Sequence, residues 1–122
     1  MLDWNEYQKQ IAANNAQIGR MNHEILKGYR GLSEAGNVTN LLGGKVRELI
    51  ALAVAVTRQC DGCIVTHTDA AIKQGATKEE IVEALSVAVA VNAGAALIFS
   101  SRVIDAFNAK TEGNTSTIAK EK

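Results

Sequence analysis

The chain has 122 residues, and its 13 basic and 13 acidic side chains cancel, so it lacks the positive charge typical of proteins that bind nucleic acid or anionic membranes. We therefore expect neither as a partner, and at this length we expect one domain. Aromatic residues make up only 4% of the chain, so its core must be built from small aliphatic side chains in closely packed helices.

The first part of the chain predicts a helix. Proline is absent and no alternating strand pattern occurs, which favours an all-α fold. Apolar residues recur at helical spacing between Trp4 and Tyr29, and Gly31 ends that stretch. Residues 31–44 then read as a loop or a short irregular helix. The polar first ten residues lack the basic and apolar regions of a signal peptide, so we expect a cytoplasmic protein.

Two further helices are predicted in the middle of the chain. The second runs from Lys45 to Thr57 and is apolar on every face, which is typical of a helix buried in a bundle or an assembly. The third begins near Cys60 and stops at Gly75, a residue type that often follows a helix.

A capping box predicts the start of a fourth helix. The segment TKEE at 77–80 allows Thr77 to cap the helix while the Glu80 side chain bonds back to the cap. This helix is expected to continue to about Phe107, and its centre, rich in Ala and Gly, lets another helix approach closely.

The C-terminal part of the sequence contains its most apolar window and then a polar tail. The most apolar window, residues 85–99, is too short to cross a bilayer, which also argues against a membrane partner. A lone subunit built from such helices would expose an apolar face, so we expect a homotrimer or a homohexamer. Residues 110–122 have few apolar side chains and are predicted to be a disordered tail after a helical domain over 1–109.

The segment RQCDGCIVTH at 58–67 contains both cysteines of the chain and one of its two histidines. On a helix, Cys60, Cys63 and His67 project within an arc of roughly 60°. Cys60 lies at the predicted helix start, where the helix dipole favours the reactive thiolate, although Asp61 works mildly against it. The Cys-x-x-Cys spacing also lets one sulfur attack the other after oxidation, so this segment is the candidate site.

Glu48 is the fourth candidate residue, in the otherwise apolar second helix. A buried carboxylate needs a partner, and the His67 imidazole across a helix contact would serve. Glu48 would then orient His67, completing a proton relay from thiol to imidazole to carboxylate. The alternative is that Glu48 is an exposed first-turn acid that interacts only with the helix dipole.

Together these residues form the pattern Glu-x11-Cys-x2-Cys-x3-His, realised as Glu48, Cys60, Cys63 and His67. With the flanking residues 47–85, the pattern resembles the alkylhydroperoxidase D (AhpD)-like branch of the carboxymuconolactone decarboxylase family. The resemblance implies an all-α fold in trimers or hexamers and a thiol-dependent peroxidase or disulfide reductase activity. AhpD proper is a longer, duplicated version that carries a histidine where this chain has Gly62. The decarboxylases of the family lack the cysteine pair, which argues against that activity here.

The sequence therefore predicts an enzyme of antioxidant defence that reduces a hydroperoxide or a disulfide, with an unknown thiol electron donor and no cofactor. Cys63 lies one helical turn from His67, which favours it as the peroxide-reacting thiol. Cys60 lies at the helix end, which favours it as the thiol that meets protein partners. Three alternatives use the same residues: a buried, inert cysteine pair, a zinc-binding or redox-sensing module, and a lyase or isomerase on a lactone-like molecule with His67 and Glu48 as acid and base.

Overall fold

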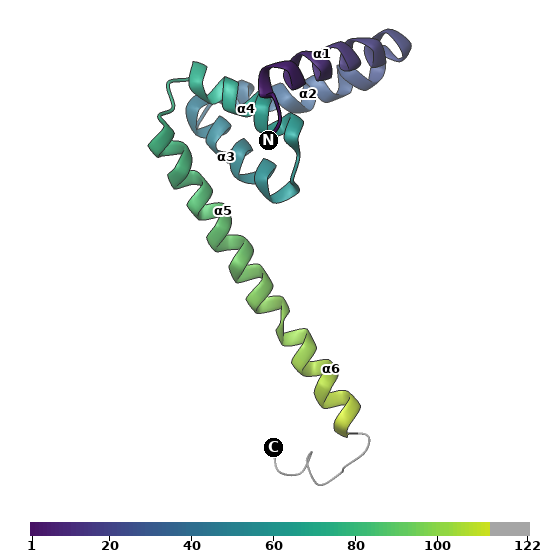
Figure 1. The fold of residues 1–122 in the computed structure, drawn as a ribbon, viewed down its shortest axis with the longest axis vertical. Helices are drawn as coiled ribbons and strands as arrows, with labels where there is room; N and C mark the ends of the chain where they lie inside the picture. The colour runs from purple at the N-terminus through teal and green to yellow at the C-terminus, as the bar shows by residue number, and fades with distance from the viewer. Residues whose placement is uncertain (113–122) are drawn as a thin grey trace. The chain divides into compact units, whose positions relative to one another are not determined.

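The structure is a computed structural model and describes residues 1–112. The described residues form six helices and no strand, which confirms the predicted all-α fold (Figure 1). The helices are α1 (Trp4–Met21), α2 (His23–Thr39), α3 (Gly44–Arg58), α4 (Asp61–Lys73), α5 (Lys78–Phe99) and α6 (Ser101–Glu112). The chain divides into two units, one up to Ala88 and one from Val89 onward.

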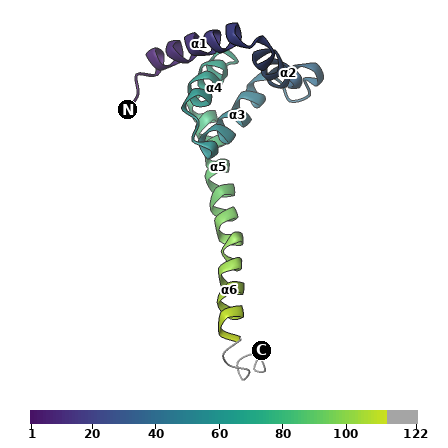
Figure 2. The ribbon, with the colours of Figure 1, turned by 90° about the vertical axis from the view of Figure 1, so that its right-hand side faces the viewer.

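In the first unit, α3 and α4 pack against each other and supply most of its buried side chains. These are Leu52 and Ala55 on α3 and Val65 and Ala71 on α4. Helix α1 packs against both α2 and α4, and Figure 2 shows it crossing α4. Helix α4, which begins beside Cys60, is therefore held between α3 on one side and α1 on another.

The helix predicted from Trp4 to Tyr29 is in fact two helices that meet at Asn22. Asn22 has an extended backbone, with φ −151° and ψ 94°, and its backbone N–H donates to the carbonyl of Ile18 at the end of α1. Its side-chain oxygen accepts a hydrogen bond from the Glu24 N–H at 3.2 Å. Asparagine is among the best helix N-caps, so it can end one helix and start the next without disturbing the apolar spacing.

Residues 31–44, predicted as a loop or a short irregular helix, are mostly regular helix: α2 continues to Thr39 and leaves only residues 40–43 as a connection. Arg47 of α3 holds this end of α2: its guanidinium donates to Asn40 Oδ1 at 2.7 Å and to Asn37 Oδ1 at 2.8 Å. A Cβ on Gly36 would lie 2.8 Å from the Arg47 Cδ atom. Glycine inside the helix therefore gives the arginine side chain room, which compensates for its low helix propensity.

Helix α3 matches the predicted second helix, but it is not buried on every face. Leu52 and Ala55 are buried, whereas Val46, Ile50 and Val54 are 40%, 48% and 55% exposed. The apolar sequence of α3 therefore provides one face to the α4 contact and leaves another uncovered in the single chain.

The connection between α4 and α5 has the predicted signals. Gly75 follows α4 with φ +83°, a conformation that suits glycine after a helix. The capping box is confirmed: the Thr77 N–H donates to the Glu80 carboxylate at 2.8 Å and the Glu80 N–H donates to Thr77 Oγ1 at 3.1 Å. Glu80 also pairs with Lys45 Nζ at 2.8 Å, which ties the start of α5 to the start of α3.

The long helix predicted up to Phe107 is interrupted at Ser100. The Ser100 and Ser101 hydroxyls donate to the carbonyls of Ala96 and Ile98, at 2.7 Å and 2.9 Å. Serine side chains that bond back to helix carbonyls compete with the regular backbone pattern and commonly bend a helix. Within the second unit, Figure 1 shows α6 continuing beyond the end of α5.

The assigned tail begins inside a helix. Residues 110–112 belong to α6, where the Thr111 hydroxyl donates to the Phe107 carbonyl at 2.9 Å. The rest of the predicted tail, residues 113–122, lies outside the described residues.

The helical stretch that contains the apolar window at 85–99 is longer than that window. The stretch Lys78–Glu112 contains an 18-residue window of mean hydropathy 2.0, so by length and composition it could cross a membrane. Its exposed side chains include Val91, Leu97 and Phe107 at 65%, 76% and 65%. A helix that is apolar on all faces is covered either by lipid or by other protein, and the centre of a soluble assembly meets the same criterion.

Candidate functional site

The polar centre of the site is a contact between Glu48 and His67. Glu48 lies on the second turn of α3, and its Oε2 atom is 2.7 Å from His67 Nδ1 on α4. Both side chains are about three-quarters buried. The predicted contact is therefore present, and the alternative of an exposed first-turn acid does not hold, because Glu48 is neither exposed nor in the first turn.

This contact sets the chemistry of the imidazole. An ionised carboxylate can only accept hydrogen bonds, so the Nδ1 atom of His67 carries the proton that it donates to Glu48. The other ring nitrogen, Nε2, then has a free lone pair in the neutral imidazole and can accept a proton. A carboxylate behind the ring also stabilises the imidazolium that forms.

The two cysteines lie at the first turn of α4, as predicted. Cys60 is the N-cap residue, with an extended backbone (φ −106°, ψ 100°), and both thiols are free and half-buried. Their sulfur atoms are 3.0 Å apart, and in the neutral pair the Cys60 thiol donates to the Cys63 sulfur. Once Cys60 is ionised it can only accept, and the Cys63 thiol becomes the donor. The Cys63 backbone N–H also donates to the Cys60 sulfur, at 3.4 Å. As a thiolate, Cys60 therefore accepts two hydrogen bonds at the end of the helix where a negative charge is most stable.

These contacts shift the pKa values of the two thiols in opposite directions. The pKa of Cys60 is lowered, chiefly by the hydrogen bond from the Cys63 side chain and then by backbone N–H groups, against smaller opposing effects of burial and the Asp61 charge. The pKa of Cys63 is raised because its proton is held by Cys60, and burial and the charge on Cys60 add to this effect. The arrangement favours Cys60, rather than Cys63, as the thiolate.

The pKa difference leads to a first prediction. Replacing Cys63 with alanine removes the largest cause of the lowered pKa, so the Cys60 titration should move to higher pH. At neutral pH less thiolate will be present, and alkylation of Cys60 by iodoacetamide should slow. Replacing Cys60 with alanine should move the Cys63 titration to lower pH. Ultraviolet absorbance of the thiolate against pH measures both shifts, and an unchanged Cys60 titration in Cys63→Ala would contradict this cause.

The cysteines and His67 line a cavity of about 350 Å³ between α4 and the α1–α2 pair. Its walls are mostly apolar and include no charged side chain apart from the titratable His67. They are formed by Ile11, Asn15, Ile18, Ile25, Leu26, Tyr29, Cys60, Gly62, Cys63, Thr66 and His67. The thiols therefore open into a weakly polar cleft in which an uncharged molecule can reach them.

Gly62 lies where α1 approaches the cysteine turn. A Cβ at this position would be 3.1 Å from the Ile11 Cδ1 atom, which is tighter than ordinary side-chain contact. The absence of a side chain between the two cysteines therefore lets α1 close one wall of the cavity. A histidine here, as in AhpD proper, would require Ile11 to move.

The α1 and α2 walls of the cavity were missed in the sequence. Ile11, Ile18 and Ile25 recur every seventh residue, and this spacing predicts a helix without indicating a cavity wall. The same spacing is the signal that could have identified the wall, but only if the helix break at Asn22 had been recognised.

The described residues give no support to a metal site. Among residues 1–112, no group of three or more His, Cys, Asp or Glu side chains is arranged to hold a metal ion. The carboxylate of Glu48 is directed at a nitrogen of His67. The zinc alternative therefore lacks the converging ligands that such a site requires.

The fold and the site define a small all-helical protein with a hydrogen-bonded cysteine pair beside a carboxylate–histidine pair. Residues 23–106 match the carboxymuconolactone decarboxylase family, and the chain belongs to that family. The match covers every candidate site residue, from Glu48 to His67.

Two uncharacterized proteins and one solved structure of the same family are similar to this chain. An uncharacterized protein from Haemophilus influenzae is 40% identical over 87% of this chain and 94% of its own length. A protein of the cox locus of Paracoccus denitrificans, also uncharacterized, is 34% identical over 72% of this chain and 79% of its own. The crystal structure of a carboxymuconolactone decarboxylase family protein from Legionella pneumophila, in its apo form, superposes with a TM-score of 0.69. It is 33% identical and covers 86% of this chain and 94% of that one.

Proposed function

We propose that the protein is a cytoplasmic thiol oxidoreductase that reduces hydroperoxides or the disulfide of a partner, in defence against oxidants. The observation that supports this most strongly is the sulfur–sulfur distance of 3.0 Å between Cys60 and Cys63, in a cavity shared with His67. Two sulfurs at this distance need only a small movement to form a disulfide.

The proposed reaction begins with the Cys60 thiolate, which attacks the terminal oxygen of the hydroperoxide. The oxygen–oxygen bond breaks, an alcohol leaves, and the Cys60 sulfur becomes a sulfenic acid. Cys63 then attacks this sulfur, a disulfide forms and water leaves. Overall, the dithiol loses two hydrogen atoms and the hydroperoxide becomes an alcohol and water. An external dithiol donor then reduces the disulfide by exchange and is itself oxidised.

His67 and Glu48 handle the protons in this scheme. The Nε2 atom of His67 accepts a proton from the thiol pair as the attacking thiolate forms, and it returns a proton to the leaving oxygen. Glu48 does not touch the substrate; it fixes the tautomer of His67 through the 2.7 Å contact and stabilises the imidazolium. Glu48 is therefore a positioning residue.

The direct test is turnover. The full-length protein, supplied with dithiothreitol, should consume an organic hydroperoxide or an uncharged disulfide continuously and faster than dithiothreitol alone. Metal analysis of the same preparation, purified without a chelator, distinguishes the zinc-binding alternative from the oxidoreductase. Stoichiometric zinc with no turnover would overturn the enzyme proposal.

We also propose that the chain works as a homotrimer or homohexamer. The exposed apolar side chains of α5 and α6, among them Leu97 and Phe107, require a cover, and further copies of the chain supply one. The central Ala and Gly residues of α5 allow the close helix approach that such an interface needs.

This proposal predicts the sedimentation behaviour. In aqueous buffer at micromolar concentration, the protein should sediment as a single oligomer of three or six chains. Leu97→Glu should shift it toward smaller species, because a charge would be buried in the interface, whereas the exposed control Asp105→Asn should not. A stable monomer, or a chain that stays in solution only with detergent, would contradict the proposal.

A further inference from the structure

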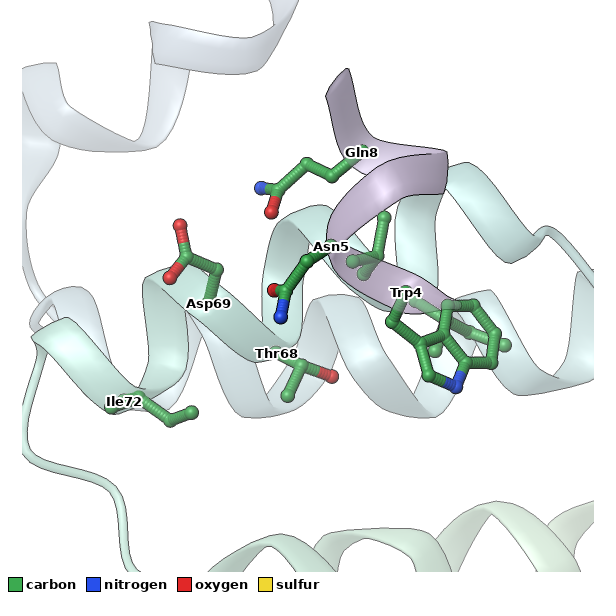
Figure 3. Close-up of a pocket in the computed structure, with 8 residues that line it drawn as sticks. Trp4, Asn5, Gln8, Thr68, Asp69 and Ile72 are labelled. Carbon is green, nitrogen blue, oxygen red and sulfur yellow. The ribbon is translucent and has the colours of Figure 1, made fainter. Parts of the chain in front are cut away.

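A second cavity, of about 370 Å³, lies between the first turns of α1 and the α4 helix. Trp4, Asn5 and Gln8 line it from α1, and Ile64, Val65, Thr68, Asp69 and Ile72 line it from α4 (Figure 3). It shares no lining residue with the cavity that contains the cysteines. A molecule bound here would therefore not contact the residues that line the cysteine cavity.

The lining of this cavity has an apolar part and a polar part. Ile64, Thr68 and Ile72 stand one turn apart along α4, so their side chains lie on the same face. Trp4 lies at one end of this face and Ile72 at the other, with the hydroxyl of Thr68 between them (Figure 3). The amide side chains from α1 extend over the same face. A ligand that fits needs an apolar body and a group that forms hydrogen bonds.

The charge on the cavity lining determines which kind of polar group a ligand can carry. Asp69 is the only charged side chain on it, and the hydrogen bond from Lys73, followed by smaller effects that include one from Gln8, lowers the Asp69 pKa, so it is ionised at neutral pH. Lys73 Nζ pairs with it at 2.9 Å but does not line the cavity and is 73% exposed. Exposed ion pairs of this kind are weak, so another cation can compete for the carboxylate. An anionic ligand would be repelled.

We propose that this cavity binds a small amphipathic amine. Its aromatic or branched aliphatic body would lie against Trp4, Ile64 and Ile72. Its ammonium group would pair with the Asp69 carboxylate, and the side chains of Asn5, Gln8 and Thr68 would accept or donate the remaining hydrogen bonds. The cavity volume is at the lower end of the range of about 300–1,000 Å³ for small-molecule sites, which suits a single-ring ligand.

Because Trp4 is the only tryptophan of the chain, its fluorescence reports on this cavity and not on the one at the cysteines. The full-length protein is titrated with 2-phenylethylamine, 2-phenylethanol and 3-phenylpropionate, which share a ring and differ in the polar group. The amine should give a saturable change at millimolar concentration, the alcohol should bind about five times more weakly, and the carboxylate should not bind. Asp69→Asn should weaken the amine about five- to tenfold and leave the alcohol unchanged.

The control substitution Asp105→Asn, on α6, should leave both titrations unchanged. Calorimetry of the same titrations checks that a fluorescence change reflects binding. Equal binding of the three probes, or full amine affinity in Asp69→Asn, would overturn the proposal. So would a Trp4 emission that depends on protein concentration and not on any probe, because it would mean that a second copy of the chain covers the cavity.

Discussion

Replacing Cys60 with alanine is expected to abolish reduction of the oxidant, with a loss of at least about 10³-fold in rate. The reason is that Cys60 is the thiol that ionises more readily: it is the N-cap of α4, the Cys63 backbone N–H donates to its sulfur, and the Cys63 thiol lowers its pKa. The remaining thiol, Cys63, has a raised pKa while Cys60 is present, and without Cys60 it has no second sulfur with which to form a disulfide.

Cys63→Ala is the matched variant and should behave differently. Cys60 can still attack once, although more slowly, and the product should be a chain that has gained one oxygen atom as a sulfenic acid. Stopped-flow measurement of hydroperoxide loss and mass spectrometry of the products distinguish the two variants. If Cys63→Ala loses the first step and Cys60→Ala retains it, the roles are reversed. Activity that survives the loss of both cysteines would instead favour acid–base chemistry by His67 and Glu48.

His67→Ala is expected to slow the reaction by roughly the 10²- to 10⁴-fold typical of the loss of a general base. The loss should shrink as the pH rises, because the thiol then ionises without a base. Glu48→Gln should lower the rate as well, since glutamine can present either its amide or its carbonyl to the ring and no longer fixes the tautomer. In the double mutant the loss should be little greater than in His67→Ala alone, because Glu48 acts only through the imidazole.

Two exposed residues provide controls for this pair. His23, the only other histidine, lies at the start of α2, and Glu34 is an exposed acid of the same helix. His23→Ala and Glu34→Gln should keep the rate of the unchanged protein. If the effects of His67→Ala and Glu48→Gln simply add, the two residues act independently and there is no relay.

The candidate site could be predicted from the sequence because most of it is local. Cys60, Cys63 and His67 lie within about two turns of one helix, so their shared face follows from helix geometry alone. The role of Glu48 is harder to predict because it lies on another helix. A carboxylate in an apolar helix nevertheless requires a partner. The 2.7 Å contact with His67 meets that requirement.

The cavity around the site could not be predicted in the same way. Its outer walls come from α1 and α2, and their placement depends on the turn at Asn22. Asparagine also occurs inside helices, and its neighbours continue the apolar spacing, so neither spacing nor propensity marks the break. The anchoring of α2 by Arg47 depends on contacts over seven to ten residues with Asn40 and Asn37, which become visible only in three dimensions.

The apolar helices show a different gap between sequence and structure. The composition of α3 and α5 predicts helices whose apolar faces are covered, but it cannot tell a core within the chain from an interface between chains. In the single chain, Ile50 and Val54 of α3 and Leu97 of α5 remain exposed. Core and interface helices have the same composition because both exclude water from the same kinds of side chain.

The most direct test of the redox proposal is the thiol count and mass of the native protein before and after one equivalent of cumene hydroperoxide. Trypsin cuts after Arg58 and Lys73, so one peptide contains both cysteines and reveals any bond between them. We predict the loss of both thiols, a mass lower by two hydrogen atoms, and a peptide with an internal Cys60–Cys63 disulfide. Two thiols that remain free in excess hydroperoxide would contradict the proposal that this pair reduces hydroperoxides.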